Sequence, residues 1–174
     1  AYIVGHCRGS TAFGSTTVAC SGDYDIFVAK IDTNGIWQWA VKAGGPHIDE
    51  GFGIAVGSDG SVYITGAFCQ PFGTPSACSA SFGSVTLNGY GSNSNDVFVA
   101  KLSNSGSWIW AARAGGNSGD YGTSIAVDSN GDAYVTGAFE SSTIQFGSTT
   151  LSLNGSSDVF ISKIDANGMW QWAK

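Results

Sequence analysis

Charged residues are scarce in this sequence, and basic residues are especially few. Only 11% of the 174 residues are charged, 7 are Lys or Arg, and the formal net charge is −6. A nucleic-acid-binding protein needs a basic face that displaces counterions from phosphates. The sequence therefore argues against a nucleic-acid partner, and equally against an anionic membrane surface.

Proline, long apolar runs and helical periodicity are also missing. The 3 Pro residues are too few for a proline-rich disordered segment, and no apolar run approaches the length that spans a bilayer. We therefore expect no membrane insertion. The chain opens on residues 1–5, which already read as a strand, so we expect any export signal to lie outside it.

Glycine and aromatic residues are abundant instead. The chain has 26 Gly, and 13% of its residues are aromatic. Glycine supplies turn conformations, and aromatic side chains fit the pleated surface of a sheet. The composition predicts an all-β protein of many short strands joined by tight turns.

One sequence unit occurs three times. An Asp followed by an apolar strand and a Lys appears at residues 25–32, 96–103 and 158–165. Each copy is followed by a Gly-containing turn and a Trp-x-Trp pair, at residues 37–39, 108–110 and 170–172. The spacing between copies varies in one place only, just before the Asp, which marks a tolerant insertion site in a structural repeat.

Each unit reads as four strands, which we name a, b, c and d. In the second unit they are residues 53–56, 62–66, 96–101 and 108–110. Short Gly turns join a to b and c to d, as in hairpins. Four-stranded antiparallel units at such a period predict about three β-propeller blades. A β-solenoid is the alternative, but its coils are shorter.

The repeats divide the chain into residues 1–45, 46–116 and 117–174. The first unit lacks strand a, its innermost strand, and three blades fall below the usual number for a closed propeller. We therefore expect the array to be incomplete on its own. Its expected partners are further blades of a longer chain or other copies of itself.

The repeat resembles the SBBP β-propeller repeat of bacteria. The resemblance rests on the Asp-Val-Phe-Val-Ala-Lys strand, the Asn-Gly-x-Trp-x-Trp turn, and the Tyr-Val-Thr-Gly strand, and it covers essentially the whole chain. It implies a propeller in a secreted or cell-surface protein with a surface or adhesive role. It supplies no catalytic residues.

Four cysteines stand in the segments between strands b and c. Cys7 and Cys20 bracket the first such segment, and Cys69 and Cys78 open the second. The third unit has Phe139 and Leu153 where the first has its two Cys, as residues facing across a hairpin would. We predict the disulfides Cys7–Cys20 and Cys69–Cys78, with four free thiols as the alternative. The spacing does not suit a thiolate metal site.

The b–c and d–a connections emerge on one face of a propeller and hold all the length variation. This face is where we expect any ligand. Its candidate residues could bind a cation or a sugar hydroxyl. The alternative is that they are ordinary solvent-exposed charged residues and surface histidines with no ligand. They are His47, Asp49, Glu50, Asp120 and Tyr121. His6, the other histidine, is expected at the surface.

Other recurring residues have structural explanations. Asp25, Asp96 and Asp158 open strand c each time, so we predict that each accepts hydrogen bonds from backbone amides of the preceding turn. The Trp pairs could stack on sugars, but their strict recurrence favours packing. No nucleophile elbow, zinc-protease motif or phosphate loop is present, so we predict no catalytic residues, no metal site and no cofactor.

Two functions of different classes follow. The first is a non-enzymatic extracellular structural or adhesive protein, part of a larger propeller or of a surface filament. The second is a lectin-like module that binds glycans through the b–c and d–a face. A propeller glycosidase using paired loop carboxylates is the weakest reading.

Overall fold

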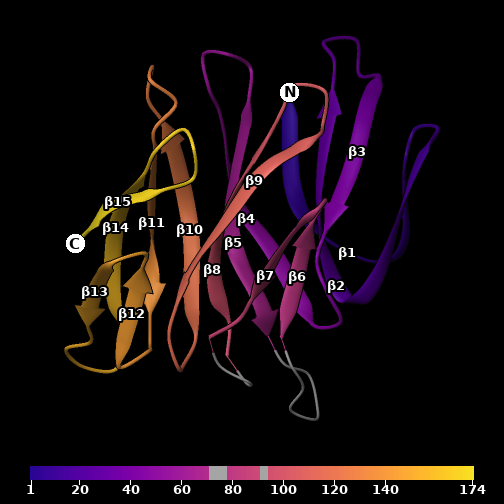
Figure 1. The fold of residues 1–174 in the computed structure, drawn as a ribbon. Helices are drawn as coiled ribbons and strands as arrows, with labels where there is room; N and C mark the ends of the chain where they lie inside the picture. The colour runs from indigo at the N-terminus through magenta and orange to yellow at the C-terminus, as the bar shows by residue number, and fades with distance from the viewer. Residues whose placement is uncertain (71–77, 91–93) are drawn as a thin grey trace.

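The computed structural model describes residues 1–70, 78–90 and 94–174 and contains only strands and turns (Figure 1). The strands are β1 (Tyr2–Phe13), β2 (Thr16–Ile31), β3 (Trp37–Ala43), β4 (Ile48–Val56), β5 (Val62–Gln70), β6 (Ser79–Phe82), β7 (Val85–Asn88), β8 (Asp96–Leu102), β9 (Trp108–Gly115), β10 (Asp120–Val127), β11 (Ala133–Phe139), β12 (Thr143–Phe146), β13 (Thr149–Ser152), β14 (Asp158–Ile164) and β15 (Trp170–Ala173). The all-β prediction is confirmed.

The strands form antiparallel meanders in the predicted a-b-c-d order. In the second repeat the order is β4-β5-β8-β9, and in the third it is β10-β11-β14-β15. The first repeat has β1, β2 and β3 in the places of b, c and d. The predicted β-propeller blades are therefore confirmed, and the described strands do not close into a barrel.

The variable segment between b and c folds into a second hairpin in every repeat. It is β6–β7 in the second repeat and β12–β13 in the third, while in the first the ends of β1 and β2 extend to form it. Each hairpin turns on a Phe-Gly-Ser sequence whose glycine has positive φ: 61° at Gly14, 62° at Gly83 and 57° at Gly147. The sequence indicated a hairpin only for the first and third of these segments, and the structure has one in all three.

These hairpins join neighbouring repeats. In the third repeat, Gln145 and Phe146 pair with Gly115 and Ala114 at the end of β9 in the second. The β6–β7 hairpin bridges to the first repeat in the same way, through Ser81 and Gly44. A parallel bridge between β2 and β4 adds a third link, so β1 to β9, without β6 and β7, share one sheet with β12 and β13. The repeats are thus joined by backbone hydrogen bonds as well as side chains.

Each hairpin also packs on its own repeat through one phenylalanine. Phe82 lies 5.1 Å from the Phe98 ring and 5.3 Å from the Trp108 ring, measured between centroids. The same trio recurs as Phe13, Phe27 and Trp37 and as Phe146, Phe160 and Trp170. Such edge-on and tilted aromatic contacts stabilise beyond simple burial. The first Trp of each pair is therefore a packing residue, as predicted.

Of the three apolar cores formed by the described residues, two lie between the repeats. One unites Ile26 and Val28 of β2 with Ile64 and Phe98 of the second repeat. The other unites the second repeat with β11 and β14 of the third. All of β8 is buried because it faces both cores, which agrees with its apolar sequence.

Candidate functional site

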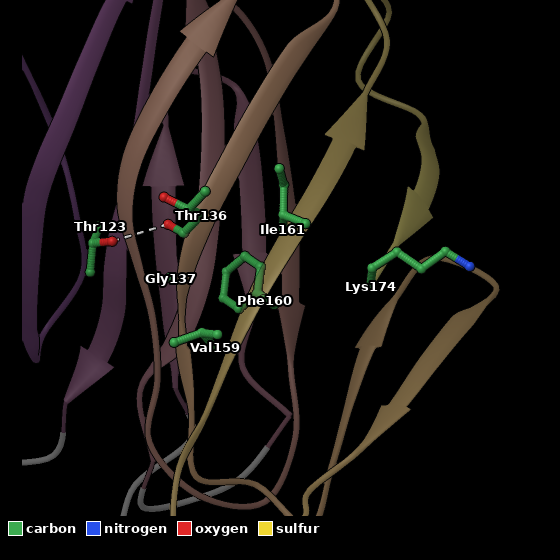
Figure 2. Close-up of a pocket in the computed structure, with 7 residues that line it drawn as sticks. All are labelled: Thr123, Thr136, Gly137, Val159, Phe160, Ile161 and Lys174. Carbon is green, nitrogen blue, oxygen red and sulfur yellow. Dashed lines mark hydrogen bonds between the residues drawn. The ribbon is translucent and has the colours of Figure 1, made fainter.

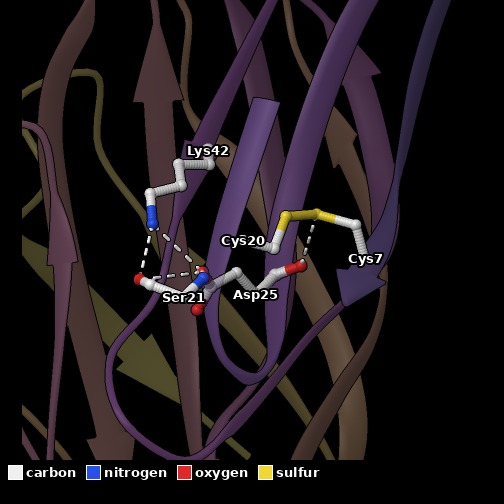
Figure 3. Close-up of a disulfide and its surroundings, with 5 residues drawn as sticks. All are labelled: Cys7, Cys20, Ser21, Asp25 and Lys42. Atoms are coloured by element: carbon white, nitrogen blue, oxygen red, sulfur yellow. Dashed lines mark hydrogen bonds and ion pairs between the residues drawn. A yellow bond between two sulfur atoms is a disulfide. The ribbon is translucent and has the colours of Figure 1, made fainter. Parts of the chain in front are cut away.

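Both predicted disulfides are present, in the hairpin segments between strands b and c. Cys7 and Cys20 have Cα atoms 6.0 Å apart, and Cys69 and Cys78 have theirs 5.6 Å apart. No free cysteine remains, so the free-thiol alternative is wrong. Figure 3 shows the first disulfide beside Asp25, the residue that opens the apolar part of β2.

The aspartate at the start of strand c accepts hydrogen bonds from the preceding turn, as predicted. Asp25 Oδ2 lies 2.6 Å from the Ser21 amide and also 3.1 Å from Lys42 Nζ (Figure 3). The Tyr90 amide donates to Asp96 Oδ2 at 2.6 Å, and the Asn154 amide donates to Asp158 Oδ2 at 2.6 Å. These carboxylates fix the path by which the chain enters strand c.

Asp49 and Asp120, two of the predicted ligand residues, are buried rather than solvated. Asp49 accepts the amides of Gly45 at 2.6 Å and Cys69 at 2.9 Å. Asp120 accepts both the amide and the hydroxyl of Ser141. Each carboxylate ties the start of strand a to the end of strand b. Solvated loop charge is therefore the wrong description of both, because the adjacent repeat packs over this connection.

The remaining predicted residues differ in accessibility. His47 is only 7% exposed, which corrects the expectation of a surface histidine. His6 is exposed, as expected, and its Nδ1 lies 3.5 Å from a carboxylate oxygen of the half-buried Glu50. Tyr121 is half-buried. Whether any of them binds a ligand stays a prediction.

The structure brings the two kinds of aspartate together in pairs. Asp25 and Asp49 both lie beside Gly44, between the first and second repeats. Asp96 and Asp120 interact electrostatically at the junction of the second and third. The two members are separated by 24 residues in each pair. That repeated spacing is the sequence signal for the pairs, although the strand-c aspartates were predicted to be structural and the strand-a aspartates to be ligand residues.

Burial makes the carboxyl groups of Asp49, Asp96 and Asp120 weaker acids. It raises the pKa of Asp49 from 3.8 to about 7, opposed by its two amide donors and reinforced by the Asp25 charge. Burial likewise raises the pKa of Asp96 to about 7, and the Asp120 charge adds to this. The pKa of Asp120 rises to about 6 for the same first reason. At each junction, ionisation of these buried carboxyl groups is therefore energetically unfavourable.

A second candidate region is the outer face of the third repeat. Val159 and Ile161 on β14 are 83% and 43% exposed, whereas Val97 and Val99, their equivalents on β8, are fully buried against the next repeat. A groove of about 520 Å³ lies here over β10, β11 and β14, with the Phe160 ring at its centre (Figure 2). This face thus carries the apolar residues that contact the next repeat elsewhere in the chain, but no repeat among the described residues covers it.

The second Trp of each pair makes the contact between successive repeats. Trp39 Nε1 donates to the Asn104 carbonyl at 3.0 Å, and Trp110 Nε1 donates to the Ala166 carbonyl at 2.9 Å. Both acceptors lie in the c–d turn of the following repeat. Trp172 is the equivalent residue of the third repeat, and its indole nitrogen has no acceptor within residues 1–70, 78–90 and 94–174.

Known classes of site find little support among the described residues. No group of three or more His, Cys, Asp or Glu side chains there is arranged to hold a metal ion. The same residues include no helix long and apolar enough to cross a membrane.

Comparison with known proteins supports the repeat assignment. Residues 109–138 match the SBBP family, described as a beta-propeller repeat, which confirms the resemblance over that segment. The chain is 29% identical over 150 residues to "Regulatory protein FlaEY" of Caulobacter vibrioides, covering 86% of this chain and 15% of that protein. It is 28% identical over 175 residues to "Uncharacterized WD repeat-containing protein L264" of Acanthamoeba polyphaga mimivirus, covering 86% of this chain and 12% of that one. The chain thus spans a small part of both relatives.

Proposed function

We propose that this chain is a non-enzymatic structural segment of a larger β-propeller array, located outside the cytoplasm. In this function the outer face of the third repeat binds a further blade of the same kind. The proposal rests on one observation. Trp172, Val159 and Ile161 repeat the residues with which the first two repeats hold their neighbours, and these three have no neighbour of that kind within the described chain.

The occupant that fits this face is a repeat with its own strand a. At the junction of the second and third repeats, β10 is that strand, and the position of a Cβ atom on Gly122 lies only 3.1 Å from Val97 Cγ1. A further complete repeat continues the established contact, and both relatives are long enough to contain several.

Adding a repeat tests the proposal. Lys174 aligns with Val41, so residues 42–112 appended after Lys174 continue the sequence pattern through strand d. In the 174-residue chain, Val159→Asp should change the free energy of unfolding by less than about 0.5 kcal/mol, as surface substitutions do. In the extended chain the same substitution should cost about 3 kcal/mol or more, because it buries an unpaired charge. Denaturant unfolding measures both values.

Val97→Asp is the matched control, since Val97 is fully buried in both chains and its substitution should be costly in both. Equal tolerance of Val159→Asp in both chains would contradict the proposal. So would a concentration-dependent dimer of the 174-residue chain that Val159→Asp abolishes, because the occupant would then be a second copy. Analytical ultracentrifugation distinguishes that outcome.

The disulfides support the proposed location. Two disulfides in a chain of this size favour an oxidising compartment. The lectin-like alternative keeps Glu50 and Tyr121 as half-buried residues, because His47, Asp49 and Asp120 are buried. No contact in the described residues favours sugar binding over the structural function.

A further inference from the structure

The aspartates at the start of strand c each leave one oxygen without a partner. Asp25 Oδ1 and Asp96 Oδ1 are buried and form no hydrogen bond of normal geometry among the described residues, although the Gly116 amide is close enough to Asp96 to lower its pKa. Both side chains are completely buried. An unpaired buried acceptor costs about 1–3 kcal/mol, and more when it is charged. The same oxygen is unpartnered at two equivalent positions, so the feature belongs to the repeat.

The unpartnered oxygen of Asp25 faces the aspartate of the next repeat. A Cβ atom placed on Gly44 would lie 2.5 Å from Asp25 Oδ1 and 3.0 Å from Asp49 Oδ2. The two oxygens are therefore at most 5.5 Å apart. One cation with oxygen ligands at about 2.3–2.6 Å can contact two oxygens that are up to about 5.2 Å apart, which covers nearly the whole range that this bound allows.

Backbone carbonyl oxygens gather at the same place. A Cβ atom on Gly22 would contact the Gly45 carbonyl oxygen and would lie 2.9 Å from the His47 carbonyl oxygen and 3.0 Å from Asp25 Oδ1. Only glycine leaves this space open. Carboxylate and carbonyl oxygens together are the donor set of a calcium ion, whereas zinc prefers nitrogen and sulfur.

The second junction repeats the arrangement. A Cβ atom on Gly115 would collide with Asp96 Oδ1, and the Asp120 carboxylate acts electrostatically on Asp96. Each junction has two aspartates and one basic residue nearby. Lys42 pairs with Asp25, and Arg113 acts electrostatically on Asp96. One negative charge at each junction is thus left without a partner when both carboxylates are ionised.

From this geometry we propose that each junction between repeats binds one calcium ion, held by the strand-c aspartate of one repeat and the strand-a aspartate of the next. The ion partners the orphaned oxygens and joins the two repeats. No third metal-binding side chain is present among the described residues, so backbone carbonyls and water complete the coordination. This proposal is independent of the function proposed above.

Calorimetric titration of the chelator-treated 174-residue chain with CaCl2 tests it. The expected result is two ions per chain, with half-saturation at about 10⁻⁴–10⁻³ M, the range of extracellular calcium modules. The melting temperature should rise with calcium and return with chelator. Asp25→Asn and Asp96→Asn should each remove one ion, and the double variant should remove both. Circular dichroism confirms that each variant is folded.

Asp158→Asn is the matched control. Asp158 occupies the same position in the third repeat and accepts the same kind of turn amide, but no strand-a aspartate faces it within the described residues. This variant should keep both ions. The absence of calcium binding at several millimolar would overturn the proposal. So would an Asp49→Asn variant that is more stable than the parent while calcium stabilises neither, since the pair would then share a proton.

Discussion

Trp39 occupies the space beside Gly106 where a side chain would begin. A Cβ atom on Gly106 would lie 2.8 Å from the Trp39 ring, while the Trp39 indole donates to the Asn104 carbonyl two residues earlier. Trp110 stands in the same relation to Gly168. One ring, one carbonyl and one glycine therefore make a contact that is repeated at each junction.

This contact predicts that Gly106→Ala is more destabilising than Gly35→Ala. Both glycines have positive φ, 84° and 78°, so both substitutions share the strain of a left-handed alanine, about 1–2 kcal/mol. Gly35 has nothing within 4 Å of its Cβ position, whereas Gly106 meets Trp39. The additional cost of overpacking should be about 1–3 kcal/mol. Urea unfolding of the two variants measures the difference, and equal losses would show that the Trp39 contact does not hold the repeats together.

The repeat pattern was enough to predict strands a to d, their order and the packing role of the first Trp. Cys7 and Cys20 could be paired from the sequence because the third repeat shows which residues face each other. The burial of Asp49 could not be predicted in this way. A charged residue after a Gly-Gly turn reads as solvated, and only the neighbouring repeat, packed over it, turns its carboxylate inward.

The pairing of each b–c hairpin with the neighbouring repeat could not be predicted from the sequence either. The segment around Gln145 is short and varies in length between repeats, which is typical of a loop. Its backbone pairing with Gly115 depends on how two repeats sit together. Local strand propensity cannot predict this pairing, because the segment forms a strand only through its contact with the neighbouring repeat.

The first disulfide should contribute about 3 kcal/mol to the free energy of unfolding, by the entropy of the loop that it closes. Cys7 and Cys20 are separated by 13 residues, in a hairpin that also carries the Phe13 contact. The double variant Cys7→Ala/Cys20→Ala should lose about that amount in denaturant unfolding. Reducing agent should destabilise the parent more than this variant. Equal effects of reductant on both proteins would mean that the first disulfide adds no stability.

Stability in chelator should fall as the pH rises towards neutrality. Burial raises the pKa of Asp49 and of Asp96 to about 7, while the unfolded chain titrates near 3.8. Between these values the folded chain binds more protons than the unfolded chain, so the free energy of unfolding decreases with increasing pH. The change should be about 1 kcal/mol or more for each carboxyl group.

Melting curves at pH 5 and pH 8 show whether stability rises or falls with pH, and we expect the higher melting temperature at pH 5. Asp49→Asn should flatten the dependence by removing one of the three carboxyl groups with a raised pKa. Calcium should flatten it too, since the ion replaces the proton as partner of the carboxylates. Greater stability at pH 8 than at pH 5 in chelator would contradict the assignment of raised pKa values.

The disulfides also decide how far this chain can be stretched. They close segments of 13 and 9 residues, and their Cα atoms stay 6.0 and 5.6 Å apart whatever happens to the rest of the fold. At about 3.4 Å per extended residue, roughly 60 Å of contour length is withheld from a chain pulled at its ends. In an array under tension, the first two repeats would therefore extend less on unfolding than their length in sequence implies, while the third, with Phe139 and Leu153 in place of the cysteines, would extend in full.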